Sequence, residues 1–385
     1  MSVTLTISGD FCITPPYLSK NLITEEIQNL FKKSDINIVN LECPVNNADE
    51  AKKIVKNGPH LQTKKEIFKF LQQLNVTAVT LANNHILDYD FQGLQSTIDA
   101  CHENKIAYTG VGENLKDAAK PLVLEKNDLR IAIVNFCENE WSIATEETAG
   151  ANPLDITENF DQIKNAKTLA DFVIVIIHGG NENFSLPSPR IKKMYRFFAE
   201  NGANAVISHH THCISGFEVH NNVPIFYGLG NMIFTYESES PEWFTGLTLQ
   251  LSLQKELQIK WELIPTTQSK ENFILGILEG KEKEEILQKI EKYSAIIADE
   301  EKLKLEWASF VKSRKEQYLL AFSAINLVPG KYLRGILRRL GIMPLLFPRK
   351  FLLPVINYTF CEAHLEVTKE VFKNKLLKNE NSNTP

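Results

Sequence analysis

Residues Val206–Gly216 read VISHHTHCISG and place three of the chain's nine histidines within four positions, directly after an apolar run. The apolar run predicts a buried strand. In open α/β sheets, ligands bind outside the carboxyl ends of the strands. His210 and His212 stand two apart, so in strand geometry they would point the same way and serve one metal or two adjacent metals.

Four other predicted strands also end in residues that are able to ligate a metal. Short apolar runs alternate with helix-like segments over residues 1–265, which predicts an α/β fold. Carboxylates, amide oxygens and imidazoles together suit one or two divalent ions such as Mn, Fe, Zn or Mg, and two ions could clamp an in-line phosphoryl displacement. The residues at these strand ends are Asp10, Asn40, Glu42, Asn84, His85 and His178, with Glu182 four positions further on.

Residues 266–385 differ from the preceding region in their hydrophobic periodicity and composition. Ile286, Ile290 and Ile297 repeat at helical spacing, so we expect a helical C-terminal extension. Within it, residues 331–354 are basic and apolar without an acidic side chain, a composition typical of contact with a membrane surface or a synthase. The alternative is a basic cover that packs on the acidic body.

Composition limits the classes of partner and compartment. The net charge of −5 argues against nucleic-acid binding, and the six cysteines show no CxxC spacing. The chain opens directly on a strand-like pattern and contains no apolar run of eighteen residues. These features predict a cytoplasmic protein, either free or peripheral at the inner face of the membrane.

Six motifs in fixed order carry a family resemblance over roughly residues 3–250. The chain resembles the CapA family of poly-γ-glutamate capsule synthesis proteins, which is similar to a branch of the calcineurin-like metallophosphoesterase superfamily. The resemblance implies a β-sandwich core flanked by helices. The motifs are ISGDF (7–11), NLECPV (40–45), LANNHILDYD (81–90), IIHGGNE (176–182), SHHTHCISGFE (208–218) and PIFYGLGNMIF (224–234).

The resemblance also implies a role for individual residues. His85 would act on the leaving group as a general acid or by stabilising charge, and His209 would be either the spare histidine of the triplet or an additional ligand. Apart from the resemblance, Gly228, Gly230 and Asn231 have the pattern of a strand–turn–strand with a backbone position that only glycine adopts easily. The implied metal ligands are Asp10, Glu42, Asn84, His178, His210 and His212.

The chain departs from the superfamily pattern at its first motif. The superfamily opens with Asp-x-His, and Cys12 stands here in place of that histidine. Cys12 shares a predicted strand face with Asp10, so it is either a ligand or a small buried residue. Glu182 is a candidate to compensate for the missing histidine. A site with a single metal is the alternative to a dinuclear site.

Simpler structural roles compete at three positions. Asp10 could be a turn aspartate, and His178 could be a core histidine satisfied by a carbonyl group. The stretch ANNHILD could be a helix N-cap, with Asn84 or Asp88 bonding backbone N–H groups. The clustering of these residues with the other histidines favours metal ligation at Asp10 and His178.

Two functions remain open from the sequence. The first is a metal-dependent hydrolase of the CapA type, acting on a phosphorylated or polymer-related small molecule. The second is a non-catalytic accessory protein of surface-polymer assembly, which keeps the site for structure or for ligand binding. Cys12 in place of the expected histidine favours the second.

Overall fold

The computed structural model describes residues 2–46, 52–255, 258–321 and 349–380. The chain divides into two compact units. The first comprises residues 1–54 and 60–303, and the second comprises residues 55–59 and 304–385. All of the implied site residues belong to the first unit.

The first unit contains a mixed sheet of eight strands in which β1, β2, β3 and β4 are parallel neighbours. On the other side of β1, the long strands β14 and β15 continue the sheet in antiparallel fashion, and β13 pairs with the end of β1. The strands are β1 (Ser2–Cys12), β2 (Ile36–Leu41), β3 (Ala78–Thr80), β4 (Ala107–Thr109), β13 (Asn231–Phe234), β14 (Thr245–Gln254), β15 (Gln258–Gln268) and β16 (Leu275–Ile277).

A second sheet of six strands has the order β11-β12-β10-β9-β7-β6. Its four central strands are parallel, and an antiparallel strand closes each edge. A separate short pair joins β5 (Val111–Gly112) to β8 (Gly150–Ala151). The six strands are β6 (Leu122–Lys126), β7 (Leu129–Cys137), β9 (Phe172–His178), β10 (Ala205–His209), β11 (Phe217–His220) and β12 (Val223–Phe226).

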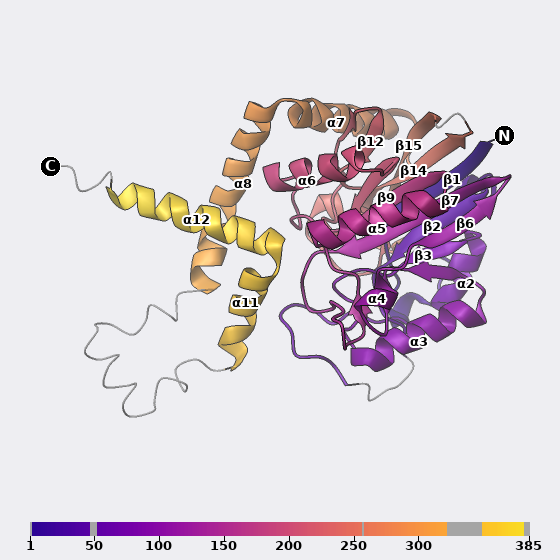
Figure 1. The fold of residues 1–385 in the computed structure, drawn as a ribbon, viewed down its shortest axis with the longest axis horizontal. Helices are drawn as coiled ribbons and strands as arrows, with labels where there is room; N and C mark the ends of the chain where they lie inside the picture. Colours follow the sequence, from indigo (N-terminus) through magenta and orange to yellow (C-terminus); the bar gives the residue numbers. More distant parts are fainter. Residues whose placement is uncertain (1, 47–51, 256–257, 322–348, 381–385) are drawn as a thin grey trace. The chain divides into compact units, whose positions relative to one another are not determined.

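Three buried apolar clusters define four layers, helix–sheet–sheet–helix (Figure 1). One cluster lies between the two sheets, and the other two lie between each sheet and its helices. The predicted α/β class, with a two-sheet core flanked by helices, is confirmed. The helices are α1 (Glu25–Lys32), α2 (Ile67–Gln73) and α3 (Asp90–Glu103) on the eight-stranded sheet, α5 (Ile156–Leu169) and α6 (Pro189–Glu200) on the six-stranded sheet, with α4 (Leu115–Ala118) and α7 (Gly280–Ala298).

Helix α6 illustrates how the local sequence builds a layer. The Ser188 hydroxyl accepts a hydrogen bond from the backbone N–H of Ile191, and a proline occupies the first turn. Ile191, Tyr195 and Phe198 follow at helical spacing and are buried against the six-stranded sheet. Burial of each such side chain stabilises the fold by about 1.5–3 kcal/mol.

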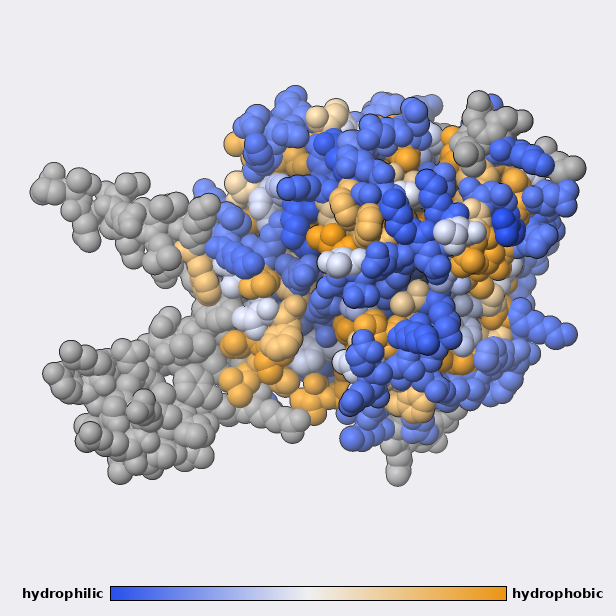
Figure 2. All heavy atoms as spheres, in the orientation of Figure 1, coloured by the Kyte–Doolittle hydropathy of each residue, from blue (hydrophilic) through white to orange (hydrophobic). Residues whose placement is uncertain are grey.

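The second unit contains most of α8 (Glu300–Ala321) together with α11 (Arg349–Phe360) and α12 (Glu362–Glu380), whereas its residues 55–59 form no helix or strand. The rings of Tyr318 and Tyr358 stack at 4.6 Å between centroids. Residues 331–348 of the predicted basic segment lie outside the described residues, and Pro354 stands inside α11. No described helix is long and apolar enough to cross a membrane. On the face drawn in Figure 2, hydrophilic side chains separate the apolar ones into small groups.

Candidate metal centre

The candidate site lies at the carboxyl ends of the parallel strands, where the core between the two sheets ends. In β9, Ile174 and Ile176 belong to the core between the sheets, and His178 follows at the same alternation. In β10, Ile207 belongs to that core and His209 follows in the same way. The face between the sheets therefore changes from apolar side chains to imidazoles at its end.

Asp10 approaches these imidazoles from the eight-stranded sheet. Its backbone N–H donates to the carbonyl of Gly230 at 3.0 Å, and the pairing of β1 with β13 shifts register just after Asp10. Gly230 has a φ of +66°, and a Cβ on Gly9 would lie 1.9 Å from the Gly230 oxygen. Of the two glycines in the predicted turn, Gly230 has the left-handed backbone and Gly228 does not. The fully buried Asp10 carboxylate accepts hydrogen bonds from the Asn40 amide (2.7 Å) and the His210 backbone N–H (3.2 Å).

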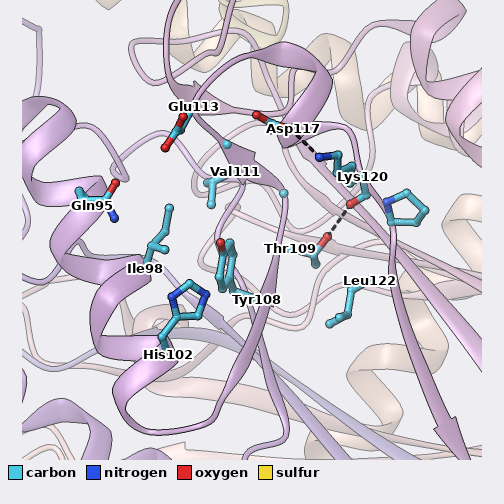
Figure 3. A pocket seen from close by; sticks show the side chains of 13 residues that line it. Gln95, Ile98, His102, Tyr108, Thr109, Val111, Glu113, Asp117, Lys120 and Leu122 are labelled. Carbon is cyan, nitrogen blue, oxygen red and sulfur yellow. Dashed lines mark hydrogen bonds and ion pairs between the residues drawn. The ribbon is translucent and has the colours of Figure 1, made fainter.

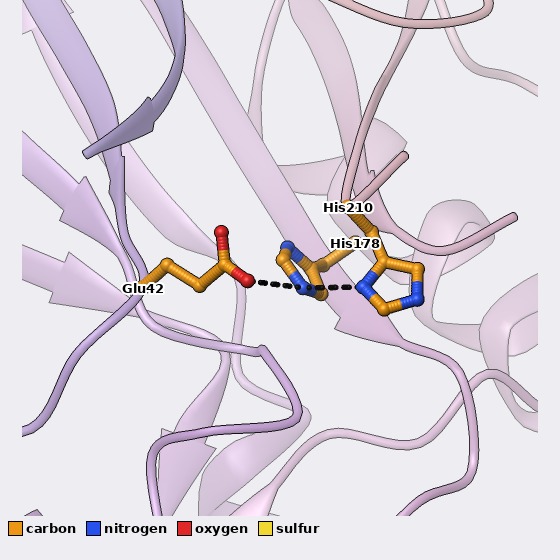
Figure 4. A group of neighbouring side chains, drawn as sticks. All are labelled: Glu42, His178 and His210. Atoms are coloured by element: carbon orange, nitrogen blue, oxygen red, sulfur yellow. Dashed lines mark hydrogen bonds and ion pairs between the residues drawn. The ribbon is translucent and has the colours of Figure 1, made fainter. Parts of the chain in front are cut away.

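Glu42 lies just beyond the end of β2 and is fully buried. Neither of its carboxylate oxygens has a hydrogen-bond partner among the described residues. Its Oε1 atom lies 3.6 Å from His178 Nε2 and 3.8 Å from His212 Nε2. Figure 4 shows the carboxylate directed toward the rings of His178 and His210. A buried carboxylate without a hydrogen-bond donor is costly, and a divalent cation is the partner that such an arrangement fits.

Two groups of candidate ligands share Glu42. One contains Glu42, His178 and His210, and the other contains Asp10, Glu42 and His212; in each, the candidate ligand atoms lie within 4.8 Å of one another. Asn84 joins the first group because its Oδ1 lies 3.0 Å from His178 Nε2. We call the first group the Asn84 half of the centre and the second the Asp10 half.

The spacing of the donor atoms fits metal ligation. His178 Nε2 lies 3.0 Å from His210 Nδ1, and His212 Nδ1 lies 3.5 Å from Asp10 Oδ2. Two ligands that share a tetrahedral ion at bonds of about 2.1 Å are roughly 3.4 Å apart. The donor set of carboxylates, an amide oxygen and imidazoles therefore suits divalent ions such as Mn, Fe or Zn.

The closing histidines leave the strand, contrary to the strand geometry predicted for them. Strand β10 ends at His209, and His210 and His212 have φ values of +88° and +54°. Left-handed backbone costs a non-glycine residue on the order of 1–3 kcal/mol and often occurs at functional sites. As a result the two rings do not point the same way into one group: His210 serves the Asn84 half, whereas His212 serves the Asp10 half.

Burial and neighbouring charges shift the pKa values of Asp10 and Glu42 in opposite directions. Burial raises the pKa of Asp10, but the imidazoles of His209 and His212 outweigh it and hold that pKa well below its usual range. Burial, followed by the negative charge of Asp10, raises the pKa of Glu42 well above its usual range. Without a cation, Glu42 is therefore the carboxylate that retains a proton more readily.

The two halves also differ in their histidines. Burial, followed by the nearby His210 ring, lowers the pKa of His178 well below its usual value. Burial lowers the pKa of His212 too, but contact with Asp10 outweighs it and raises that pKa. A histidine binds metal in its neutral form, so His178 is the better prepared of the two ligands.

His85 is paired with Asp88 next to the Asn84 half. The His85 Nδ1 atom lies 2.7 Å from Asp88 Oδ2, and the same oxygen accepts a hydrogen bond from the backbone N–H of Leu61. Asn83 accepts from the His85 backbone N–H and donates to Leu41 and Leu81 carbonyls, which replaces strand pairing after β3. The alternative of a helix cap in this stretch does not match the structure, because Tyr89 stands at the N-cap of α3 and makes no side-chain cap hydrogen bond, whereas Asp88 orients His85.

Several further residues support the ligands. Asn40 Nδ2 lies between Asp10 Oδ1 and His178 Nδ1 (2.7 and 3.1 Å), so its amide orients both side chains rather than joining either ligand group. Glu140 accepts a hydrogen bond from the Asn84 amide at 3.4 Å. The ring of Trp243 packs against His212 at 4.6 Å between centroids. Glu140 stands three positions after the buried apolar strand β7, a signal that could have identified it, whereas Trp243 follows no such strand and is identified by the structure alone.

Cys12, which replaces the expected histidine, and Glu182, the candidate to compensate for it, lie in different settings. Cys12 is fully buried in the apolar cluster beneath the helices of the eight-stranded sheet. Burial, followed by contact with Cys43, raises the pKa of the Cys12 thiol well above its usual value, which opposes ligation as a thiolate. Glu182 is exposed in the turn after His178, and its charge contributes to the raised pKa of Glu42.

A separate cavity of about 430 Å³ lies at the carboxyl end of the edge strand β4 (Figure 3). The rings of His102 and Tyr108 lie 5.6 Å apart on one side, and Asp117 pairs with Lys120 on another. None of the ligands of the two metal groups lines it.

The fold and the site define a class: a two-sheet α/β protein with a buried histidine–carboxylate cluster suited to divalent metal. The chain belongs to the bacterial capsule synthesis protein family PGA_cap, whose family profile matches residues 4–236. The expected membership of the CapA family is therefore confirmed.

Curated relatives agree with this assignment. The chain is 34% identical over 215 residues to the PGA biosynthesis protein CapA of Bacillus subtilis (strain 168), covering 55% of this chain and 56% of that protein. It is 34% identical over 220 residues to the capsule biosynthesis protein CapA of Bacillus anthracis, covering 55% and 53%. The chain thus spans little more than half the length of these relatives. A solved phosphatase of Mycoplasma pneumoniae is similar with a TM-score of 0.43 and 16% identity, covering 69% of this chain and 94% of that one.

Proposed function

We propose that this protein is a metal-dependent phosphoester hydrolase that serves the synthesis of a capsule or poly-γ-glutamate polymer. The observation that carries the proposal is the pair of ligand groups that share the buried Glu42. Divalent ions bound there would polarise a phosphoryl group and supply a nucleophile at neutral pH. The names of the two Bacillus relatives support the link to polymer synthesis.

The chain's own residues would position the reaction and transfer a proton. Asp10, Glu42 and Asn84 offer oxygen ligands, and the Asn40 amide holds Asp10 and His178 in place. His85 is held by Asp88 through Nδ1, so Nε2 is the nitrogen that would donate a proton to the leaving group. The contact with Asp88 fixes the orientation of the ring, which a proton transfer through Nε2 requires.

The first test is the metal content of the purified full-length protein, wild type beside His210→Ala. We expect about two transition-metal ions per wild-type chain and about one in the variant, because His210 belongs to the Asn84 half alone. The metal-loaded wild type should then hydrolyse phosphomonoesters or phosphodiesters, whereas the chelated protein should not. Full hydrolysis by Asp10→Asn or His210→Ala with undiminished metal content would refute the proposal.

A second candidate is an accessory protein that keeps the centre for structure or for ligand binding. The burial of Cys12 in the apolar cluster favours it, because that thiol does not join either ligand group among the described residues. In that case the protein would bind metal and a phosphorylated or polymer-related ligand without turnover. Residues 331–354 would then provide contact with a membrane surface or a synthase. Metal-dependent ligand binding without product release would distinguish the two candidates.

A further inference from the structure

His209 is a buried histidine whose ring lacks a hydrogen-bond partner. It is the last residue of β10 and is 1% exposed. Neither Nδ1 nor Nε2 has a hydrogen-bond partner within the described part of the chain. A neutral imidazole carries one donor and one acceptor, and leaving a buried polar group unsatisfied costs about 1–3 kcal/mol. The His209 ring therefore needs a bonding partner other than the side chains that the structure describes.

The position of His209 directs its ring toward the metal centre. His209 pairs in register with His178 on the neighbouring parallel strand. It follows Ile207 at the alternation that faces the other sheet. Its Nδ1 atom lies 3.6 Å from Asp10 Oδ1. This separation is too long for a hydrogen bond, and no other described acceptor is bonded to the ring.

The same separation recurs between the accepted ligands of the centre. His212 Nε2 and Glu42 Oε1 are 3.8 Å apart, and His178 Nε2 and Glu42 Oε1 are 3.6 Å apart. Ligands that share one tetrahedral ion at about 2.1 Å are roughly 3.4 Å apart. The distance between His209 and Asp10 therefore matches that between two ligands of one ion and exceeds that of a hydrogen bond.

The two halves of the centre have unequal numbers of protein ligands. The Asn84 half has four, because Asn84 adds to Glu42, His178 and His210. The Asp10 half has three, namely Asp10, Glu42 and His212. Cys12 packs in the apolar cluster on the other side of the sheet. A fourth ligand for the Asp10 half must come from elsewhere, and His209 is the neighbour with uncommitted ring atoms.

We propose that His209 is the fourth protein ligand of the Asp10 half and binds a divalent ion such as zinc through Nδ1. The assignment rests on the metal centre of the proposed function but not on hydrolysis. It gives each half four protein ligands, with Glu42 common to both. The alternative is that His209 only donates a hydrogen bond to Asp10 and positions that carboxylate.

X-ray absorption of the zinc-loaded full chain tests the assignment. Outer-shell scattering counts the imidazoles per zinc: four histidines over two ions would give an average of two for the wild type. His209→Gln should lower this average to about 1.5. It should also lower the affinity for one of the two zinc ions by at least about tenfold, which is the smallest loss expected for a residue that merely supports a ligand. The matched control His220→Gln, at a histidine paired with Glu200 outside the centre, should leave both values unchanged.

An unchanged imidazole count with both zinc ions bound at wild-type affinity in His209→Gln would overturn the proposal. Weakened affinity with an unchanged count would assign His209 to positioning only and would also overturn it. If His209→Gln fails to fold, as judged by circular dichroism without metal, the wild-type count alone decides, and an average near 1.5 refutes ligation. Two bound zinc ions without phosphoester hydrolysis would defeat the proposed function while leaving the His209 assignment intact.

Discussion

The Asn84 half and the Asp10 half of the centre share Glu42 but hold their histidines in opposite electrostatic settings. In the Asn84 half, burial and the adjacent His210 keep the pKa of His178 low. In the Asp10 half, burial acts in the same direction on His212, but the Asp10 carboxylate outweighs it and raises that pKa. The comparison indicates that protons compete with an ion more strongly at His212 than at His178.

The geometry of the two halves differs in a matching way. In the Asn84 half the donor atoms are close, with His178 Nε2 at 3.0 Å from both Asn84 Oδ1 and His210 Nδ1. In the Asp10 half, His212 Nδ1 and Asp10 Oδ2 are 3.5 Å apart, and His212 Nε2 and Glu42 Oε1 are 3.8 Å apart. We therefore expect the Asn84 half to bind its ion more tightly.

Replacement of the shared ligand Glu42 should weaken metal binding in both halves of the centre. Glu42→Gln takes a negative charge from both groups, so we expect fewer than one ion per chain and loss of hydrolysis by at least about 10³-fold, since metal supplies both charge stabilisation and the nucleophile. Metal analysis and phosphoester turnover measure the two effects. Glu113→Gln, at an exposed glutamate outside both groups, is the control. Retention of one tightly held ion would show that Glu42 does not bridge.

A second change should lower the rate and leave both halves loaded. His85→Ala removes the group that we place at the leaving oxygen, and general acid catalysis contributes about 10²–10⁴-fold to a rate. We expect a fall of that size in kcat with two ions still bound. Asp88→Asn should cause a smaller fall in kcat and a changed pH profile, because the imidazole keeps its place but loses its charged partner. Loss of metal in either variant would instead make His85 part of the ligand set.

Lowering the pH should unload the two halves in sequence. Because the pKa of His212 is raised and that of His178 is lowered, protons compete for His212 first as the pH falls. Because the pKa of Glu42 is also raised, protonation of this shared carboxylate lowers the affinity for both ions. Each competing proton lowers the affinity by about tenfold per pH unit. Metal titrations from alkaline to acidic pH should pass from two ions to one before reaching none. Simultaneous loss of both ions at one pH would contradict the distinction between the halves.

The sequence predicts the polar ends of the strands but not the segments that connect them. His178 and His209 follow from side-chain alternation, because an apolar strand with a polar end is visible in the sequence alone. The left-handed backbone of His210 and His212 is not visible, because it depends on contacts with Asn231 and with His178. The pairing of Asp88 with His85 was missed for a similar reason.

The fold shows the same division between local and distant information. Regular apolar runs predict β1, β9 and β10 well, whereas β3 ends at Thr80, earlier than its apolar pattern indicates. The Asn83 side-chain amide donates hydrogen bonds to the carbonyl groups of Leu41 and Leu81. These bonds take the place of strand pairing, so the strand ends before Asn83. That outcome depends on the neighbouring strand β2, which the local sequence does not contain.

The smallest expected effect concerns Cys12, and it tests how the Asp10 half is completed. If the thiol is only a packing element, Cys12→Ala should keep two bound ions and change kcat by less than about twofold. The fold should lose on the order of 1 kcal/mol, as for removal of one methylene-sized group from a core. Metal analysis beside thermal unfolding of the chelated protein separates the two effects. Loss of one ion in Cys12→Ala, with both retained in His209→Gln, would mean that the eight-stranded sheet completes the Asp10 half through sulfur. The opposite pattern would mean that the six-stranded sheet completes it through a fourth imidazole, so that each half draws ligands from both sheets.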